Sequence, residues 1–515
     1  MPGQLVQVEA YAGTGKTTTL EWVARRHAGR KVLYLCFNKA NAVEGRKRMP
    51  ENVTSSTLHG LAYQAVGRLY KAKMGELRAR ELKDVLRLPD GGSSQMVLQT
   101  FSAFLRTPTK QPDLAMVPGH CPKSEAPRVL EWVEQLWRRM QDTDDAVVRM
   151  PHDGYLKLWL QTAPLLRDYD LLLVDEAQDL EPLALGLALH QQREGQAGVV
   201  LVGDTHQAIY SWRGATNAME SCAKLATDRF VISECFRFPQ AHADAAAAVL
   251  KRMKNIDAPL KGRGTGEWSA EPSHAILART NARLINRAMA IKGPMHFAAT
   301  DSRTGYSPFG PYRFQEMLDT LAHYQGRSHL VETPYLRRFR DYRELKEFAL
   351  GDGSGNQDTE LVSLAKIAEE FSNQLPPILE SIVKASGPQR PGVVSLSSGH
   401  RAKGLEWDRV EVENDFVPVY DSTALTRLRF KVSPVQFKEE ANLLYVALTR
   451  ARCRLDLSPE FKQWLKIEGI ALPHPAIPAI PVKAAPASLD PTPTPRPARK
   501  AVACAAGQAE FRFPG

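Results

Sequence analysis

The chain has 515 residues, of which 43% are hydrophobic and 24% are charged, as expected for a folded protein of about three domains. It contains no apolar run as long as a membrane span and no C-x-x-C or metal-ligand spacing among its six cysteines, so we expect a cytoplasmic protein with free thiols rather than a membrane protein or zinc module. The net charge of +10 favours a polyanionic partner such as nucleic acid, although a basic solvated surface gives the same composition.

The first element is a strand, a glycine-rich turn and a helix within Val8–Leu20 (VEAYAGTGKTTTL). Such a turn points several N–H groups at a phosphate, and the positive end of the following helix adds to the attraction. Lys16 supplies a charge for the β- and γ-phosphates, and the Thr17 hydroxyl is a ligand for Mg²⁺. The G-x-x-x-x-G-K-[ST] pattern has Ala instead of Gly at position 10. The sequence predicts a nucleoside-triphosphate site formed by Ala12, Gly13, Thr14, Gly15, Lys16, Thr17 and Thr18.

Further strands alternate with helices in the first part of the chain. Lys31–Phe37 is a second apolar strand, and Val53–Tyr63 contains a third strand, a polar loop and a helix start. This alternation predicts a parallel sheet with helices on both faces and ligands at the carboxyl ends of its strands. The alternation of strands and helices stops at residues 65–164, which predict a helical insertion that includes a helix at Val129–Met140. Its basic face could follow a nucleic-acid backbone or simply be solvated.

The sheet resumes at Tyr169–Asp179, where an apolar strand ends in adjacent carboxylates. Asp175 can hold Mg²⁺, directly or through water, and Glu176 can orient and deprotonate the attacking water, although an exposed acidic turn gives the same pattern. The next strand, Gly198–Val202, leads to Gln207, which is placed to sense the γ-phosphate. An aromatic and basic cluster suited to base stacking follows at Tyr210, Trp212 and Arg213.

A second series of strands follows a strand at Phe230–Phe238 and an Ala-rich helix at His242–Met253. The strands of the series are expected at Ala275–Asn281, Val393–Leu396, Arg409–Val412 and Arg454–Leu457, with a partly helical insertion over residues 299–390. Residues 398–407 predict a basic loop at the start of a helix. A helix over 439–452 carries Arg450 near its end, where it could act as an arginine finger or simply favour the helix dipole.

The last part of the chain is rich in Pro and Ala and cannot bury a core. We expect residues 469–515 to be a disordered tail, whose two terminal aromatics, Phe511 and Phe513, could bind a protein partner or be inert. The predicted domains are 1–64 with 165–238, carrying the insertion 65–164, and 239–298 with 391–468, carrying the insertion 299–390.

Five stretches of the chain, in their order and spacing, resemble the UvrD/Rep-like superfamily 1 helicases. They are Ala12–Thr17, Asp175–Gln178, Gly203–Ala215, His400–Glu406 and Asn442–Arg450. The helicase core resembles the F-box DNA helicase branch most, without an F-box. The resemblance implies an α/β fold with two RecA-like P-loop domains on parallel sheets, each with a mainly helical insertion, and with ATP and Mg²⁺ in the cleft between them.

The resemblance also implies a role for individual residues. The catalytic set would be Lys16, Asp175, Glu176, Gln207, Arg237 and Arg450, with Thr17 and Asp175 as the metal ligands. Phe236 would stack on adenine and Glu406 would contact the ribose. Single-stranded DNA would contact Asn38, Thr57, His59, Tyr210, Trp212, Arg213, Arg279, Asn281 and His400.

One departure from the family concerns the base of the nucleotide. The family carries an adenine-reading Gln on a helix upstream of the first strand, whereas here only four residues precede Leu5, and Gln4 lies too close to the strand. Adenine would then be recognised less strictly, or by a residue elsewhere, or the start of the protein lies further upstream.

The function implied by the resemblance is an ATP-dependent helicase that moves 3′ to 5′ on single-stranded DNA or on DNA with a single-stranded overhang. It would act in DNA repair, recombination or replication. Two alternatives stay open: an ATP-driven remodeller that strips recombinase filaments, and a nucleotide-dependent DNA-binding switch without productive unwinding. RNA as the track and the oligomeric state also stay open, a monomer being compatible with the sequence.

Overall fold

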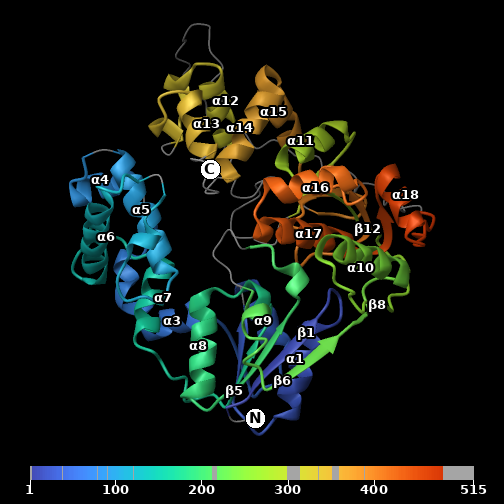
Figure 1. Ribbon diagram of the computed structural model, residues 1–515, viewed down its shortest axis with the longest axis horizontal. Coiled ribbons are helices and arrows are strands. Elements are labelled where there is room, and N and C mark those ends of the chain that lie inside the picture. Colours follow the sequence, from blue (N-terminus) through green and yellow to red (C-terminus); the bar gives the residue numbers. More distant parts are fainter. Residues whose placement is uncertain are drawn as a thin grey trace, which may run out of the picture. The chain divides into compact units, whose positions relative to one another are not determined.

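The computed structural model describes residues 3–36, 39–77, 79–89, 91–119, 121–210, 217–298, 314–333, 336–350, 359–387 and 389–478. These residues form two large parallel sheets, each with helices on its faces and a further group of helices inserted between its strands (Figure 1). Within the same ranges, no helix is both long and apolar enough to cross a membrane.

The first sheet has six parallel strands in the order β3-β2-β4-β5-β1-β6. The strands are β1 Leu5–Ala10, β2 Val32–Cys36, β3 Val53–Thr57, β4 Leu171–Val174, β5 Gly198–Gly203 and β6 Asp228–Ile232. The central strands are runs of Val and Leu, as is typical of parallel strands covered on both faces. Because all strands run in one direction, the loops after β1, β4 and β5 meet at the same edge of the sheet.

Alternate residues of the first sheet pack into two separate cores. Leu172 and Val174 face α8 (Pro182–Arg193) and α9 (Ala218–Ser221). Leu171 and Leu173 face the opposite side, which is covered by α1 and α2; these helices span Lys16–Arg26 and Lys39–Arg48. The prediction of helices on both faces is confirmed.

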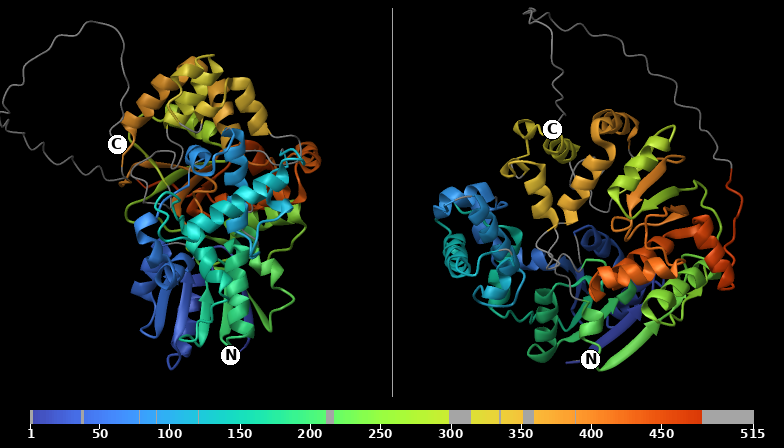
Figure 2. Two further views of the ribbon diagram at one scale, coloured as in Figure 1. Left: turned by 90° about the vertical axis from the view of Figure 1, so that its left-hand side faces the viewer. Right: turned by 45° about the horizontal axis from the view of Figure 1, so that its top comes forward.

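The first insertion is helical, as predicted. Its helices are α3 Leu58–Ala65, α4 Ala79–Leu86, α5 Gly91–Leu105, α6 Ala126–Gln141 and α7 His152–Gln161. They share one core, to which α6 contributes the apolar stripe Val129, Val133, Leu136, Trp137 and Met140. Figures 1 and 2 draw the helices of this group in blue to cyan and those of the second insertion in yellow and orange.

The second sheet has five parallel strands in the order β10-β11-β9-β12-β13. The strands are β9 His274–Ala278, β10 Met295–Phe297, β11 Val394–Ser398, β12 Trp407–Val412 and β13 Ala451–Asp456. The sequence predicted four of them and missed β10, which has only three residues.

Helices cover the second sheet on both faces. One face packs against α10 Gln240–Lys254, α16 Ser422–Lys431, α17 Pro434–Leu448 and α18 Pro459–Ile467. The other packs against α11 Asn281–Ala290 and the inserted helices α12 Phe314–Tyr324, α13 Tyr342–Leu350, α14 Thr359–Phe371 and α15 Leu375–Ala385.

Three local expectations were wrong. The strand expected at Phe230–Phe238 is two strands, because the chain leaves the first sheet after β6 and forms β7 (Glu234–Cys235), which pairs with β8 (Lys261–Gly262). No helix follows the basic loop: turns that include Gly404, whose φ is +84°, lead directly into β12. The helix expected over 439–452 ends at Leu448, and Arg450 lies in the turn before β13.

The tail predicted from residue 469 is described only as far as residue 478, over which no helix or strand occurs. The remaining residues of that prediction lie outside the described part of the chain, so disorder there stays a prediction.

Candidate functional site

The glycine-rich turn has the backbone conformation expected of a phosphate-binding loop. Gly13 and Gly15 have φ angles of +72° and +83°, which residues with a Cβ rarely adopt, and Gly15 is the N-cap of α1 without a side-chain hydrogen bond. The first N–H groups of α1 therefore lack a side-chain acceptor and are available to an anion. A Cβ on Gly13 would lie 2.6 Å from Cys235 Sγ and 2.7 Å from Arg237 Cβ. The loop thus needs glycine both for its conformation and because the 235–237 segment lies against it.

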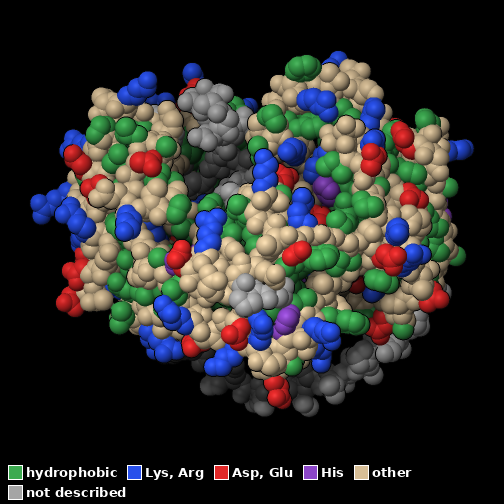
Figure 3. Space-filling model, turned by 60° about the horizontal axis from the view of Figure 1, so that its bottom comes forward, with side chains coloured by type: hydrophobic (Ala, Val, Ile, Leu, Met, Phe, Trp, Pro, Cys, Tyr) green, Lys and Arg blue, Asp and Glu red, His purple; other side chains and the backbone are tan. Residues whose placement is uncertain are grey.

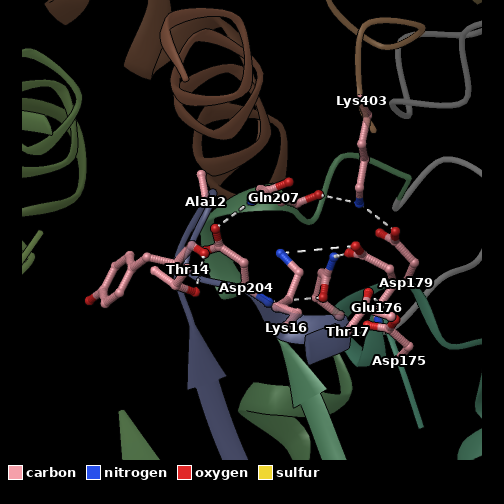
Figure 4. A network of polar contacts seen from close by, with 12 residues as sticks. Ala12, Thr14, Lys16, Thr17, Asp175, Glu176, Asp179, Asp204, Gln207 and Lys403 are labelled. Atoms are coloured by element: carbon pink, nitrogen blue, oxygen red, sulfur yellow. Dashed lines mark hydrogen bonds and ion pairs between the residues drawn. The ribbon is translucent and has the colours of Figure 1, made fainter. Parts of the chain in front are cut away.

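A hydroxyl and a carboxylate meet where the sequence predicts the metal. Thr17 Oγ1 donates to Asp175 Oδ2 at 3.2 Å (Figure 4). The Tyr34 hydroxyl donates to the same oxygen at 2.6 Å, and the Glu176 N–H donates to Oδ1 at 2.9 Å. Burial, reinforced by the adjacent Glu176 charge, raises the pKa of Asp175. Oxygen ligands from one carboxylate and one hydroxyl fit Mg²⁺, which takes few protein ligands and completes its shell with water and phosphate.

Glu176 occupies a strained position beside Lys16. Its φ of +52° is left-handed, which is uncommon for a residue with a side chain and is often found at functional sites. Lys16 Nζ lies 3.9 Å from Oε1, and Gln178 Nε2 donates to Oε2 at 2.5 Å. Burial alone would raise the pKa of Glu176, but Lys16, Lys403 and the Gln178 hydrogen bond hold it at about 2. Glu176 is therefore a carboxylate at neutral pH, as a group that orients and deprotonates water must be.

The predicted sensor, Gln207, is buried and its side chain is engaged. Its Nε2 donates to Asp204 Oδ2 at 2.6 Å, and Gln178 Oε1 accepts from the Asp204 N–H at 3.0 Å. Lys403, from the loop before β12, donates to the Gln207 carbonyl at 2.7 Å and pairs with the buried Asp179 carboxylate. Burial raises the pKa of Asp179 to about 6, although the Lys403 ammonium opposes the shift.

The two predicted arginines meet at Thr449. Arg237 Nε donates to Glu406 Oε2 at 2.6 Å, and its NH1 donates to the Thr449 carbonyl at 3.2 Å. The Arg450 guanidinium is buried and donates to the carbonyls of Val446 (2.9 Å) and Leu405 (3.2 Å) and to Thr449 Oγ1 (3.1 Å). Burial and the neighbouring Arg237 charge lower the pKa of Arg450 to about 9. Arg237, Glu406 and Arg450 are thus brought together from separate parts of the sequence.

Phe236 and Gln4, the two residues considered for contact with the base, are both exposed. Phe236 is 66% exposed, and its N–H donates to the Gly13 carbonyl at 3.0 Å. Gln4 precedes β1, whereas the phosphate loop follows the other end of the same strand. Six residues of β1 separate the two ends by about 20 Å, so a nucleotide bound at this loop would have to lie back along β1 for its base to meet Gln4.

The residues predicted to contact DNA are held by several elements. Tyr210 donates its hydroxyl proton to the His400 carbonyl at 3.3 Å, and Thr57 caps α3 by accepting from the Gly60 N–H at 3.0 Å. His59 Nε2 lies 3.0 Å from Asp153 Oδ1.

Arg279 and Asn281 lie where β9 leads into α11, and Arg279 forms a two-pronged ion pair with Glu440. Asn38, Trp212 and Arg213 lie outside the described residues. On the face seen in Figure 3, Lys and Arg side chains are scattered among acidic and apolar ones rather than gathered in one stripe.

Sequence reasoning missed the residues that join the predicted ones. The Tyr445 hydroxyl accepts from the Ala12 N–H of the phosphate loop at 3.1 Å and donates to Asp204 Oδ2 at 3.2 Å. Lys403 lies in the basic loop at residues 398–407 that the sequence predicted, so the sequence did indicate a functional role for this region. Asp204 and Tyr445 lie in the stretches Gly203–Ala215 and Asn442–Arg450 that carry the resemblance, but the sequence assigned no role to either, because a strand-end Asp and a helical Tyr are common in any α/β protein.

Comparisons with known proteins find similar sequences. One protein-family model, the AAA domain, matches residues 1–213, and a second, the UvrD-like helicase C-terminal domain, matches residues 327–460. The chain is 32% identical over 501 residues to F-box DNA helicase 1 of Gallus gallus, a match that covers 91% of this chain and 48% of the relative.

Two further relatives extend the comparison. F-box DNA helicase protein 1 of Schizosaccharomyces pombe is 29% identical over 513 residues, covering 91% of this chain and 57% of the relative. ATP-dependent DNA helicase UvrD2 of Mycobacterium tuberculosis is 28% identical over 356 residues, covering 56% of this chain and 47% of the relative. The chain spans about half the length of these relatives.

Proposed function

The chain belongs to the UvrD-like superfamily 1 helicases, and from this premise we propose that it is an ATP-dependent DNA helicase. It would move 3′ to 5′ on single-stranded DNA, separate duplex ahead of it, and act in DNA repair, recombination or replication. The observation that supports this proposal most strongly is that residues of both sheets meet at one phosphate loop. Lys16, Glu176 and Asp179 come from the first sheet, and Lys403 joins them from the second.

The first sheet supplies the phosphate-binding half of the site. Lys16 and the N–H groups at the start of α1 would hold the phosphates, and Thr17 and Asp175 would hold Mg²⁺. Bound Mg²⁺-ATP would supply the bond to be broken and a metal that neutralises phosphate charge. Glu176 orients the attacking water and accepts its proton.

Two arginines from separate parts of the chain, Arg237 after β7 and Arg450 before β13, would complete the site. Arg237 and Arg450 lie together at Thr449, and Arg450 now donates to two backbone carbonyls and a hydroxyl. To act as an arginine finger, Arg450 must exchange these acceptors for phosphate oxygens, and a shift of the turn between α17 and β13 toward the phosphate loop would allow this exchange. Such a shift links hydrolysis to movement of the second sheet.

Movement of the second sheet would carry the single strand. Tyr210 touches the loop before β12 through the His400 carbonyl, so it senses a change in that loop. Each base stacked on an aromatic side chain is worth about 1–3 kcal/mol, which holds a strand without trapping it. Repeated closing and opening would therefore move bases across such side chains.

Phosphate release with and without single-stranded DNA tests the proposal, with Lys16→Ala as the inactive control and single-stranded RNA as the alternative track. We expect DNA to stimulate hydrolysis and RNA to stimulate it less. A duplex with a 3′ overhang should be unwound and one with a 5′ overhang should not. Stimulation without unwinding of either duplex would favour the remodeller, and an absence of multiple turnovers would favour the binding switch.

A further inference from the structure

The segment from Asp204 to Tyr210 connects the predicted γ-phosphate sensor to the predicted base-stacking side chain. It begins where β5 ends and contains one short turn, η4 (Thr205–Gln207). Although it follows the first sheet, it is held along its length by side chains and one carbonyl from helices and a loop that pack with the second sheet. The contacts come from Tyr445 to Asp204, Lys254 to His206, Asn442 to Thr205 and Ala208, Lys403 to Gln207, and His400 to Tyr210.

Lys254 is the least expected of these contacts. It lies in the last turn of α10, and its ammonium donates to His206 Nδ1 and to Asn442 Oδ1, both at 2.9 Å. Within the described part of the chain, no carboxylate lies within ion-pair distance of it. Burial lowers the pKa of Lys254 to about 8, and burial followed by the Lys254 charge lowers the pKa of His206 to about 4. Because Lys254 donates to Nδ1, His206 is neutral and carries its proton on Nε2.

Asn442, on α17, is the second residue that holds the segment. Helix α17 lies beside α10 (Figure 1). While its Oδ1 accepts from Lys254, its Nδ2 donates to the Ala208 carbonyl at 2.8 Å and toward the Thr205 carbonyl at 3.5 Å. Both backbone acceptors flank Gln207. One ammonium and one amide therefore fix the segment on either side of the sensor.

A partly buried cation held by a neutral imidazole and an amide is a costly way to fill space, since the carboxylates of Glu220, Asp204 and Glu9 offset its desolvation only in part, from beyond ion-pair distance. An apolar side chain on α10 would pack there without that cost. The hydrogen bonds must therefore serve the position of the segment rather than the stability of the core.

We propose that Lys254 and Asn442 are positioning residues that couple nucleic-acid binding to ATP hydrolysis by making the segment from Asp204 to Tyr210 move with α10 and α17. This inference rests on the proposed function, because it presupposes that Gln207 responds to the nucleotide and Tyr210 to the strand. A shift of α10 and α17 then moves both side chains together. Without the two contacts, only Tyr445, Lys403 and His400 hold the segment, and the movements of the two side chains are coupled less tightly.

Lys254→Met tests the proposal, because it keeps the length of the side chain and removes the ammonium. The matched control is Arg252→Met on the same helix, whose guanidinium donates to the Val419 carbonyl at 3.4 Å and to Ser422 Oγ at 2.5 Å, away from the segment. Both variants are compared with the wild-type chain for melting temperature, basal ATPase kcat, KM for ATP, and the factor by which single-stranded DNA stimulates hydrolysis.

We expect Lys254→Met to keep the basal kcat and KM within about twofold and to lower the stimulation factor at least about fivefold, the lower end of usual coupling between sites. Arg252→Met should behave as wild type. Wild-type stimulation in Lys254→Met, or an equal loss of basal and stimulated rates, would overturn the proposal. A wild-type chain that DNA does not stimulate would instead count against the proposed function.

A second variant decides the matter if Lys254→Met does not fold. Asn442→Asp keeps the volume and the acceptor for Lys254 but loses the amide that donates to the Ala208 carbonyl. We expect the same selective loss of stimulation. Stimulation at the wild-type level in a folded Asn442→Asp variant would overturn the proposal.

Discussion

The two ends of the candidate nucleotide site differ in how completely the protein builds them. At the phosphate end, Thr14, Asp175 and Gln207 are no more than 5% exposed, and each makes a hydrogen bond that the structure defines. At the base end, Phe236 is 66% exposed, and Gln4 lies at the wrong end of β1. We expect a site of this kind to recognise the triphosphate strongly and the base weakly. Substitutions should therefore cost orders of magnitude at one end and small factors at the other.

The largest loss should follow Arg450→Ala. Removal of an arginine finger costs roughly 10³–10⁵ in turnover, and Arg237, the other guanidinium at the Thr449 turn, is already engaged by Glu406 and the Thr449 carbonyl. Phosphate release under single-turnover conditions measures the loss, and thermal unfolding verifies that the variant is folded. Arg427→Ala, an exposed arginine on α16, is the control. A folded variant that keeps more than a tenth of the wild-type rate would leave Arg450 with a structural role only.

The next largest loss should follow Glu176→Gln. The amide keeps the shape of the side chain but cannot take a proton from water, so kcat should fall about 10²–10⁴-fold while KM for ATP changes little. Steady-state kinetics separate the two parameters, and Glu194→Gln on the exposed end of α8 is the matched control. An increase in KM with an unchanged kcat would show that Glu176 binds rather than catalyses.

Phe236→Ala should have a much smaller effect, since one aromatic stack on a base is worth about 1–3 kcal/mol and this side chain is largely open to solvent. We expect KM for ATP to rise by about tenfold or less, with kcat unchanged. Phe230→Ala on β6, which is 56% exposed and distant from the loop in sequence, is the control. A loss of kcat comparable to that of Glu176→Gln would erase the contrast between the two ends.

The contrast also shows what the sequence could predict. Local sequence patterns predicted the phosphate loop, Asp175 and Glu176, because a strand and the turn that follows it determine where these side chains lie. In the structure these residues lie close together. Tyr445 and Lys254 act across the two sheets, and no local pattern indicates a contact between residues separated by 241 or 48 positions. The missed β10 and the divided strand at 230–238 have the same origin, because partners distant in sequence decide where a short strand pairs.

A smaller effect should follow Glu9→Gln and should depend on pH. Burial, with the charge of Asp204, raises the pKa of Glu9 to about 7 from a usual 4.5. The folded chain therefore holds a proton that the unfolded chain releases as pH rises from 4.5 to 7, so the wild type loses stability over that range. The variant keeps an acceptor for the Thr205 N–H, which Glu9 Oε1 accepts at 2.7 Å, and has no proton to lose.

Thermal unfolding of both chains at pH 5 and pH 8 measures this effect. The melting temperature of Glu9→Gln minus that of the wild type should be larger at pH 8 than at pH 5. An equal difference at both values would mean that Glu9 is ionised throughout, with its charge compensated at the end of β1.

The smallest effect should follow Gln4→Ala, and it isolates the base end most directly. Gln4 is exposed, and its backbone carbonyl accepts from the Val199 N–H at 2.9 Å, a bond that alanine retains. Since the strand β1 separates this residue from the phosphate loop, KM for ATP and the ratio of ATP to GTP hydrolysis should stay within about twofold of wild type. Titration of the initial rate against each nucleotide measures both. A marked loss of preference for ATP would mean that the nucleotide lies along β1 rather than beside Phe236. The exposure of Phe236 would then no longer indicate that the base is weakly recognised.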